Sequence, residues 1–116
     1  MKFLCLAYGD QQKMEALTKV EFETLVAKCR VHDEELLQSG HLILVESLDW
    51  TTKTVRARSG KVVTSDGPFV ETKEQLGGFM LIEARDLNEA IRIASRIPPG
   101  RLGCIEVRPV RQISRP

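Results

Sequence analysis

The sequence has few of the features that mark nucleic-acid-binding proteins. Aromatic residues make up 5% of its 116 residues, and its 17 basic and 16 acidic side chains leave a formal net charge of +1. Nucleic-acid interfaces usually combine a basic surface with aromatic side chains that stack on bases. The arginines of the last third, from Arg92 to Arg115, are spread out and indicate a solvated face. We therefore expect no nucleic-acid partner.

Cysteines are few and widely spaced. Cys5, Cys29 and Cys104 are odd in number and form no CxxC pair. This spacing argues against a disulfide framework and against a zinc site. Reduced thiols fit a cytoplasmic location, and we expect no bound metal.

Long apolar runs and cofactor-binding motifs are also missing. The apolar run at residues 3–8 is short and lacks a small-residue cleavage site, so we expect a strand rather than a signal peptide. No stretch approaches the ~20 apolar residues that span a bilayer. The sequence has no phosphate-binding loop, nucleophile elbow or dinucleotide fingerprint. These absences predict a protein without a membrane segment or a cofactor.

The patterns that are present predict a single domain over residues 1–116. Thr18 and Glu21 form a T-x-x-E capping box, which predicts the start of a helix of about 20 residues that ends at Gly40. Asp86 and Glu89 form a second capping pair before a shorter helix. Apolar runs and alternating stretches predict strands at residues 3–8, 42–48, 54–58, 61–65, 79–84 and 104–108.

The first predicted helix carries apolar side chains at helical spacing, which favours one buried face. These side chains are Phe22, Leu25, Val26, Cys29, Leu36 and Leu37. The outer positions are polar, so the helix should cover a sheet on one side only.

The order of the predicted elements indicates an α+β fold. Strands 54–58 and 61–65 flank Ser59-Gly60 and predict an exposed hairpin. Without this hairpin the order is βαββαβ, the ferredoxin-like arrangement of an antiparallel sheet with both helices on one face. The other face needs a cover. A second copy would supply it, giving a homodimer of the dimeric α/β-barrel type with the hairpin as an insertion.

The loop from Asp66 combines backbone constraint with charge. Gly67 can take a positive φ, Pro68 fixes its own φ, and Asp66 can accept hydrogen bonds from nearby amides. Glu71, Lys73 and Glu74 follow, and Gly77-Gly78 permits a bulge or close backbone packing.

The sequence resembles the DGPF-domain branch of the YCII-related proteins. The matching segments are residues 6–10, 34–40, 54–58, 66–78, 81–84 and 105–109. The resemblance implies a small dimeric protein, related to isomerases, monooxygenases and other enzymes that act on small organic molecules. It also implies association with extracytoplasmic-function sigma factors. Enzyme-like relatives carry a His-Asp pair with the histidine early in the first helix. No histidine occurs here between Met1 and Val31, so the histidine of the pair has no counterpart, and Asp66 is a candidate counterpart of the aspartate.

Six residues are candidates for a site, each with a structural alternative. Asp66 and His32 are candidate acid–base residues, although Asp66 equally suits a turn and His32 a packing position. The ligand-binding candidates are Arg56, Phe69, Glu71 and Lys73. Arg56 shares a ribbon face with Arg58, where both either clamp an anionic group or are solvated. Phe69 is expected to fill apolar space beneath the loop.

Two functions follow from these residues. The first is a cytoplasmic homodimer that holds a small organic molecule beside residues 66–73, with or without proton-transfer chemistry. The second is a non-enzymatic interaction or regulatory module that works with a sigma factor and uses the hairpin as its contact surface. A structural dimer whose catalytic machinery has decayed is a third option. Convergence of Asp66, His32 and Arg56 in one cleft would favour the first.

Overall fold

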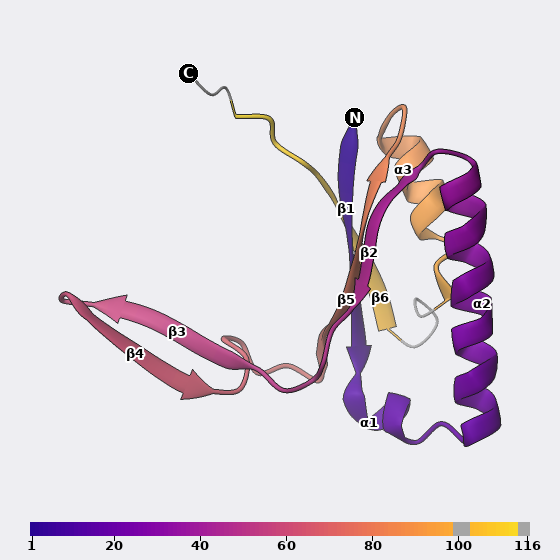
Figure 1. The fold of residues 1–116 in the computed structure, drawn as a ribbon. Coiled ribbons are helices and arrows are strands. Elements are labelled where there is room, and N and C mark those ends of the chain that lie inside the picture. Colours follow the sequence, from indigo (N-terminus) through magenta and orange to yellow (C-terminus); the bar gives the residue numbers. More distant parts are fainter. Residues whose placement is uncertain (99–102, 114–116) are drawn as a thin grey trace.

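The computed structural model describes residues 1–98 and 103–113, and Figure 1 shows their arrangement. The elements in order are β1 (Lys2–Asp10), α1 (Gln11–Glu15), α2 (Lys19–Gln38), β2 (Leu42–Ser47), β3 (Lys53–Arg58), β4 (Lys61–Asp66), β5 (Glu74–Glu83), α3 (Leu87–Ala94) and β6 (Gly103–Pro109). Both predicted helix starts are confirmed, with Thr18 and Asp86 as the N-caps of α2 and α3.

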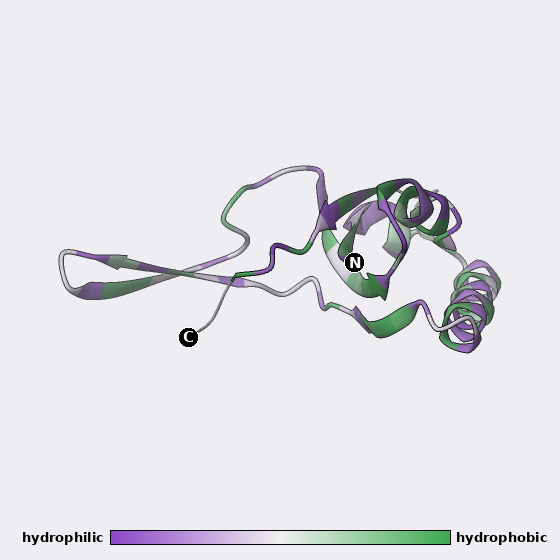
Figure 2. Cartoon of the chain, turned by 90° about the horizontal axis from the view of Figure 1, so that it is seen from above, coloured by the Kyte–Doolittle hydropathy of each residue, from purple (hydrophilic) through white to green (hydrophobic). Residues whose placement is uncertain are grey.

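Four strands form one sheet in the order β2-β5-β1-β6, and every neighbouring pair is antiparallel. Helices α2 and α3 lie on one side of this sheet (Figure 1). Strands β3 and β4 pair only with each other and form a separate ribbon, which extends away on the opposite side in both views (Figures 1 and 2). The result is a mixed α+β fold, consistent with the predicted ferredoxin-like class.

The hydrophobic core lies between the sheet and the helices. Alternation along β1 and β5 directs every second side chain toward the helices, where the core is formed by Phe3, Cys5, Met80, Ile82, Ala90 and Ile93, among others. Phe3 and Ile82 are fully buried. The remaining side chains of the central strands point to the other face, which no described element of the chain covers.

Helix α2 contacts this core over only part of its length. His32 and Leu36 are its buried residues, whereas Phe22 is 50% exposed and Leu37 is 59% exposed. The prediction that Phe22 and Leu37 belong to the buried face is wrong for this chain. The apolar side chains of α2 are distributed around its circumference, so their spacing alone did not identify the packed face.

Strand β5 is longer than predicted because Gly77 and Gly78 lie inside it. The register between β1 and β5 shifts at Ala7 and Tyr8, opposite these glycines, as expected for a bulge. A Cβ atom on Gly77 would lie 3.0 Å from the Trp50 ring, and one on Gly78 would lie 3.0 Å from the Glu46 carbonyl oxygen. The two glycines therefore allow close packing, one of the alternatives that their sequence suggested.

No helix in the described part of the chain is both long enough and apolar enough to cross a membrane.

Gly9 and Gly103 face each other across β1 and β6 and should respond differently to substitution. A Cβ on Gly103 would lie 1.9 Å from the Tyr8 carbonyl oxygen, whereas one on Gly9 has ordinary contact with Trp50 at 3.8 Å. We expect Gly103→Ala to lower the free energy of unfolding by about 1–3 kcal/mol, and Gly9→Ala to change it by less than about 0.5 kcal/mol. Urea denaturation measures both. Equal stability of the two variants would contradict the described pairing of β1 with β6.

Candidate functional site

The Asp-Gly-Pro turn lies at the base of the β3–β4 ribbon. Gly67 has φ 91°, its N–H donates to the Thr52 carbonyl at 2.9 Å, and the Thr54 hydroxyl donates to the Gly67 carbonyl at 2.8 Å. The Asp66 side chain is 89% exposed and accepts a hydrogen bond from Lys53 Nζ at 2.9 Å. This turn joins the two ends of the ribbon.

The other loop candidates lie on the surface and contact near neighbours. The Arg56 guanidinium stacks over the Phe69 ring at 4.7 Å from its centroid, a cation–π contact. Because Phe69 is 69% exposed, the prediction that it fills apolar space beneath the loop is wrong for the single chain. Lys73 Nζ lies 3.9 Å from the buried carboxylate of Asp10, and Glu71 is exposed.

His32 lies on the other side of the sheet from these residues. It projects from α2, whereas Asp66 and Arg56 belong to the ribbon that leaves the opposite face (Figure 1). A single chain therefore does not bring Asp66, His32 and Arg56 together. His32 is 9% exposed, and its Nδ1 atom has no hydrogen-bond partner among the described residues. The nearby carboxylate oxygen of Asp33 is 4.0 Å away, too far for a hydrogen bond.

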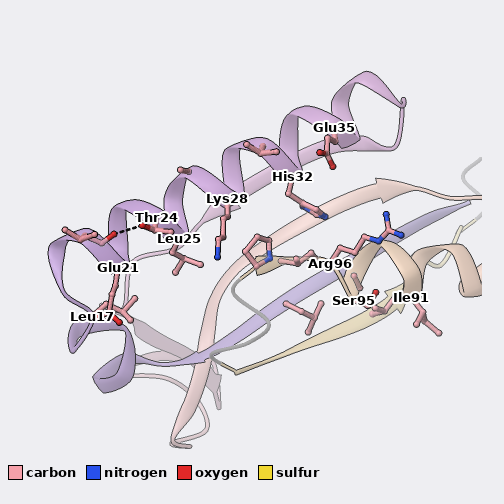
Figure 3. Close-up of a pocket in the computed structure, with 18 residues that line it drawn as sticks. Leu17, Glu21, Thr24, Leu25, Lys28, His32, Glu35, Ile91, Ser95 and Arg96 are labelled. Atoms are coloured by element: carbon pink, nitrogen blue, oxygen red, sulfur yellow. Dashed lines mark hydrogen bonds between the residues drawn. The ribbon is translucent and has the colours of Figure 1, made fainter.

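His32 lines a groove of about 1460 Å³ between α2, the C-terminal end of α3 and β6 (Figure 3). The groove walls are mainly apolar and include Leu25, Val31, Ile91, Ile97, Ile105 and Val107. Lys28 projects into the groove from α2, and Arg96 projects into it from the segment after α3 (Figure 3). An unpaired imidazole and two cations thus share a largely apolar space.

Lys28 and Arg96 were not among the residues singled out from the sequence. Lys28 lies one helical turn before His32, so helical spacing could have placed it on the same face. Arg96 follows the end of α3, and the sequence contains no signal that relates it to α2. Only the packing of α3 against the sheet brings it to the groove.

The cysteines do not supply an activated nucleophile. Burial raises the pKa of the Cys5 thiol to about 11. Burial, with the Asp33 carboxylate as a second cause, also raises the pKa of Cys29, and the pKa of the exposed Cys104 thiol is raised as well. Burial raises the pKa of Asp33 itself, an effect partly opposed by His32. A thiol reacts as its thiolate, so none of the three cysteines has the lowered pKa of an activated nucleophile.

The described residues contain no group of three or more histidine, cysteine, aspartate or glutamate side chains that could hold a metal ion.

The fold and the groove define a small α+β protein with a candidate site between a helix layer and an antiparallel sheet. The YCII-related domain family matches residues 1–114. An uncharacterised protein of Rhizobium meliloti is 35% identical over 114 residues, which is 95% of this chain and 92% of that protein. The chain belongs to the YCII-related domain family. Its relative carries no assigned function, so the site must be interpreted from its own chemistry.

Replacing His32 tests whether this side chain stabilises the folded protein. A buried polar atom without a partner costs free energy, so His32→Leu should raise the free energy of unfolding of the unliganded protein by about 1 kcal/mol. Leu36→Ala, one turn further along the same helix, should lower it by about 2–5 kcal/mol, as for an ordinary core residue. Urea denaturation separates these results. A loss of stability in His32→Leu as large as that in Leu36→Ala would identify His32 as a packing residue.

Proposed function

We propose that the protein binds a small organic molecule in the groove between α2, α3 and β6, with His32 as the group that hydrogen-bonds the ligand and exchanges a proton with it. The observation that carries this proposal is His32, which lines a mainly apolar groove and whose buried Nδ1 atom has no hydrogen-bond partner among the described residues. Buried polar atoms are normally paired. Because His32 lines the groove, its imidazole lies beside a bound ligand, and imidazole is suited to proton transfer near neutral pH.

We place the ligand in the groove and not beside the Asp66–Lys73 loop. The charges of that loop are exposed or engaged with near neighbours, whereas His32 in the groove is buried. Interactions of charged and polar groups are stronger where water is excluded. We assign Asp66, Arg56 and Phe69 to the support and the contact surface of the ribbon.

We further propose that the protein acts as a homodimer of the dimeric α/β-barrel type. The sheet face opposite the helices presents Leu4, Leu6, Tyr8, Leu44, Phe79 and Leu81, and cross-strand register pairs Leu6 with Phe79 and Leu4 with Leu81. A second copy that packs its own sheet against this face would bury a continuous apolar surface.

The ribbon supports the same proposal. Its valines Val55 and Val62 are 65% and 71% exposed, and an isolated two-stranded ribbon is only marginally stable in water. The Cα radius of gyration is 16.4 Å, whereas a compact chain of this length has about 13 Å. We propose that the ribbon is an insertion in a ferredoxin-like core and that it lies against the second copy.

The Asp66-Gly67-Pro68-Phe69 turn supports assignment to the DGPF branch of the family, and the three cysteines, all free, support a cytoplasmic location. A second function, an interaction module with a sigma factor as partner, is favoured by the exposed basic ribbon with Arg56, Arg58 and Lys61. Such a module would need no ligand in the groove.

Blocking the groove should abolish ligand binding. We expect a panel of small metabolites to include compounds that raise the melting temperature of the wild-type protein. Val31 lines the groove and is exposed, so Val31→Trp should fill part of it and eliminate the shift. Phe22→Trp, an exposed position of α2 outside the groove, should retain the shift. Absence of any stabilising compound, or an equal shift in Val31→Trp, would contradict the proposed site.

A charge on the open sheet face should separate the subunits. In sedimentation equilibrium we expect the wild-type protein at twice the 13.1 kDa subunit mass and Phe79→Asp at the subunit mass, because an unpaired carboxylate in an apolar interface is strongly unfavourable. Phe22→Asp, on α2, should remain dimeric. An unaltered circular dichroism spectrum establishes that each variant is folded. A wild-type protein that sediments as a monomer would overturn the dimer proposal.

A further inference from the structure

We infer that the ligand of this groove is an elongated apolar molecule that carries one carboxylate group, and that Lys28 and Arg96 hold this group from opposite walls. The inference rests on the proposed small-molecule function and specifies the chemical class of the ligand.

Two basic side chains, Lys28 and Arg96, line the groove. Lys28 and Arg96 belong to different elements, and both side chains project into the groove (Figure 3). Neither forms an ion pair with any acidic side chain in residues 1–98 and 103–113. Both side chains are exposed, and an anion bound between them would contact a cation on each wall of the groove. The planar guanidinium of Arg96 suits a carboxylate particularly well, because it can donate two parallel hydrogen bonds.

The acidic residues of the groove limit the charge of the ligand. Glu21 and Glu35 also line it, seven residues before and seven residues after Lys28 on α2. At 1.5 Å per residue, each lies about 10 Å along the helix from Lys28. Both carboxylates are thus close enough to act on an anion at the centre of the groove. A single negative charge between Lys28 and Arg96 is favoured, whereas a polyphosphate would extend toward one of these carboxylates.

The remaining walls define the rest of the ligand. Leu25, Val31, Ile105 and Val107 offer apolar contact away from the cations. The volume of about 1460 Å³ exceeds the usual ~300–1,000 Å³ of small-molecule pockets, so the groove accommodates an extended molecule. His32 lies one turn beyond Lys28 and can hydrogen-bond a second polar group of the ligand.

A pair of probes that differ mainly in charge tests the inference. We choose 4-phenylbutyrate and its neutral counterpart 4-phenylbutanamide, titrated into the wild-type protein and followed by calorimetry. The carboxylate should bind at least about tenfold more tightly than the amide. Lys28→Met and Arg96→Met keep the apolar stems, and each should weaken binding of the carboxylate about tenfold while leaving the amide unchanged. Lys19→Met, on an exposed position of α2 outside the groove, is the matched control and should bind both probes as the wild type does.

The outcomes separate the inference from the function on which it rests. If the two probes bind the wild-type protein with equal affinity and neither binds Val31→Trp, the carboxylate assignment is overturned. The groove then remains a ligand site. Preference for the carboxylate that persists in both Lys28→Met and Arg96→Met would overturn the assignment of these residues. Binding of neither probe would count against both the inference and the proposed function.

Discussion

The unequal length of the two helices determines how the sheet is covered. Helix α2 has 20 residues and α3 has 8, which correspond to about 30 Å and 12 Å of helix. Because α3 ends at Ala94, the central part of α2 faces a groove instead of another helix. His32 of α2 and Arg96, two residues beyond the end of α3, both line this groove. The N-caps Thr18 and Asp86 start helices α2 and α3. The position of α3, the shorter helix, is set by its packing on β1 and β6.

His32 on the helix side of the sheet and the candidate residues on the ribbon side differ in exposure. On the ribbon side, Lys53 pairs with Asp66 and Arg56 stacks on Phe69, all in contact with water. Exposed pairs of this kind contribute about 0–1 kcal/mol each. On the helix side, His32 is removed from water and has no partner among the described residues. Chemistry is therefore better supported in the groove, although the ribbon side carries the more distinctive sequence.

Local features of the fold were predictable from the sequence, whereas long-range ones were not. The strand at residues 3–8, the N-caps Thr18 and Asp86 and the Ser59-Gly60 hairpin depend on neighbouring residues, and they occur as predicted. The short helix α1 was missed because Asp10, read as the end of a strand, is also its N-cap. Phe22 and Leu37 are exposed because the apolar side chains of α2 surround the helix, and the α2 sequence alone does not identify the face that packs on the sheet.

For the candidate site, a single residue was predictable from the sequence, but its spatial partners were not. His32 was identified because it lies at the edge of a helical stripe, and its burial agrees with that position. Its pairing with Asp66 was suggested by residue type and by the His-Asp pair of enzyme-like relatives, and the topology places the two residues on opposite sides of the sheet. The presence of Lys28 and Arg96 in the same groove depends on segments far apart in the sequence. No local pattern relates them.

The closed base of the ribbon has a mechanical consequence. The hydrogen bond from Gly67 N–H to the Thr52 carbonyl ties the incoming chain to the outgoing chain, and the Leu48 N–H is bonded to the Gly77 carbonyl within β5. The two strands of the ribbon are thus joined at its base, and residues 48–52 and 67–73 connect them to the sheet. Ser59-Gly60 lies at the far end of the ribbon, so any change of direction at the base would displace the tip by a larger distance than the base itself.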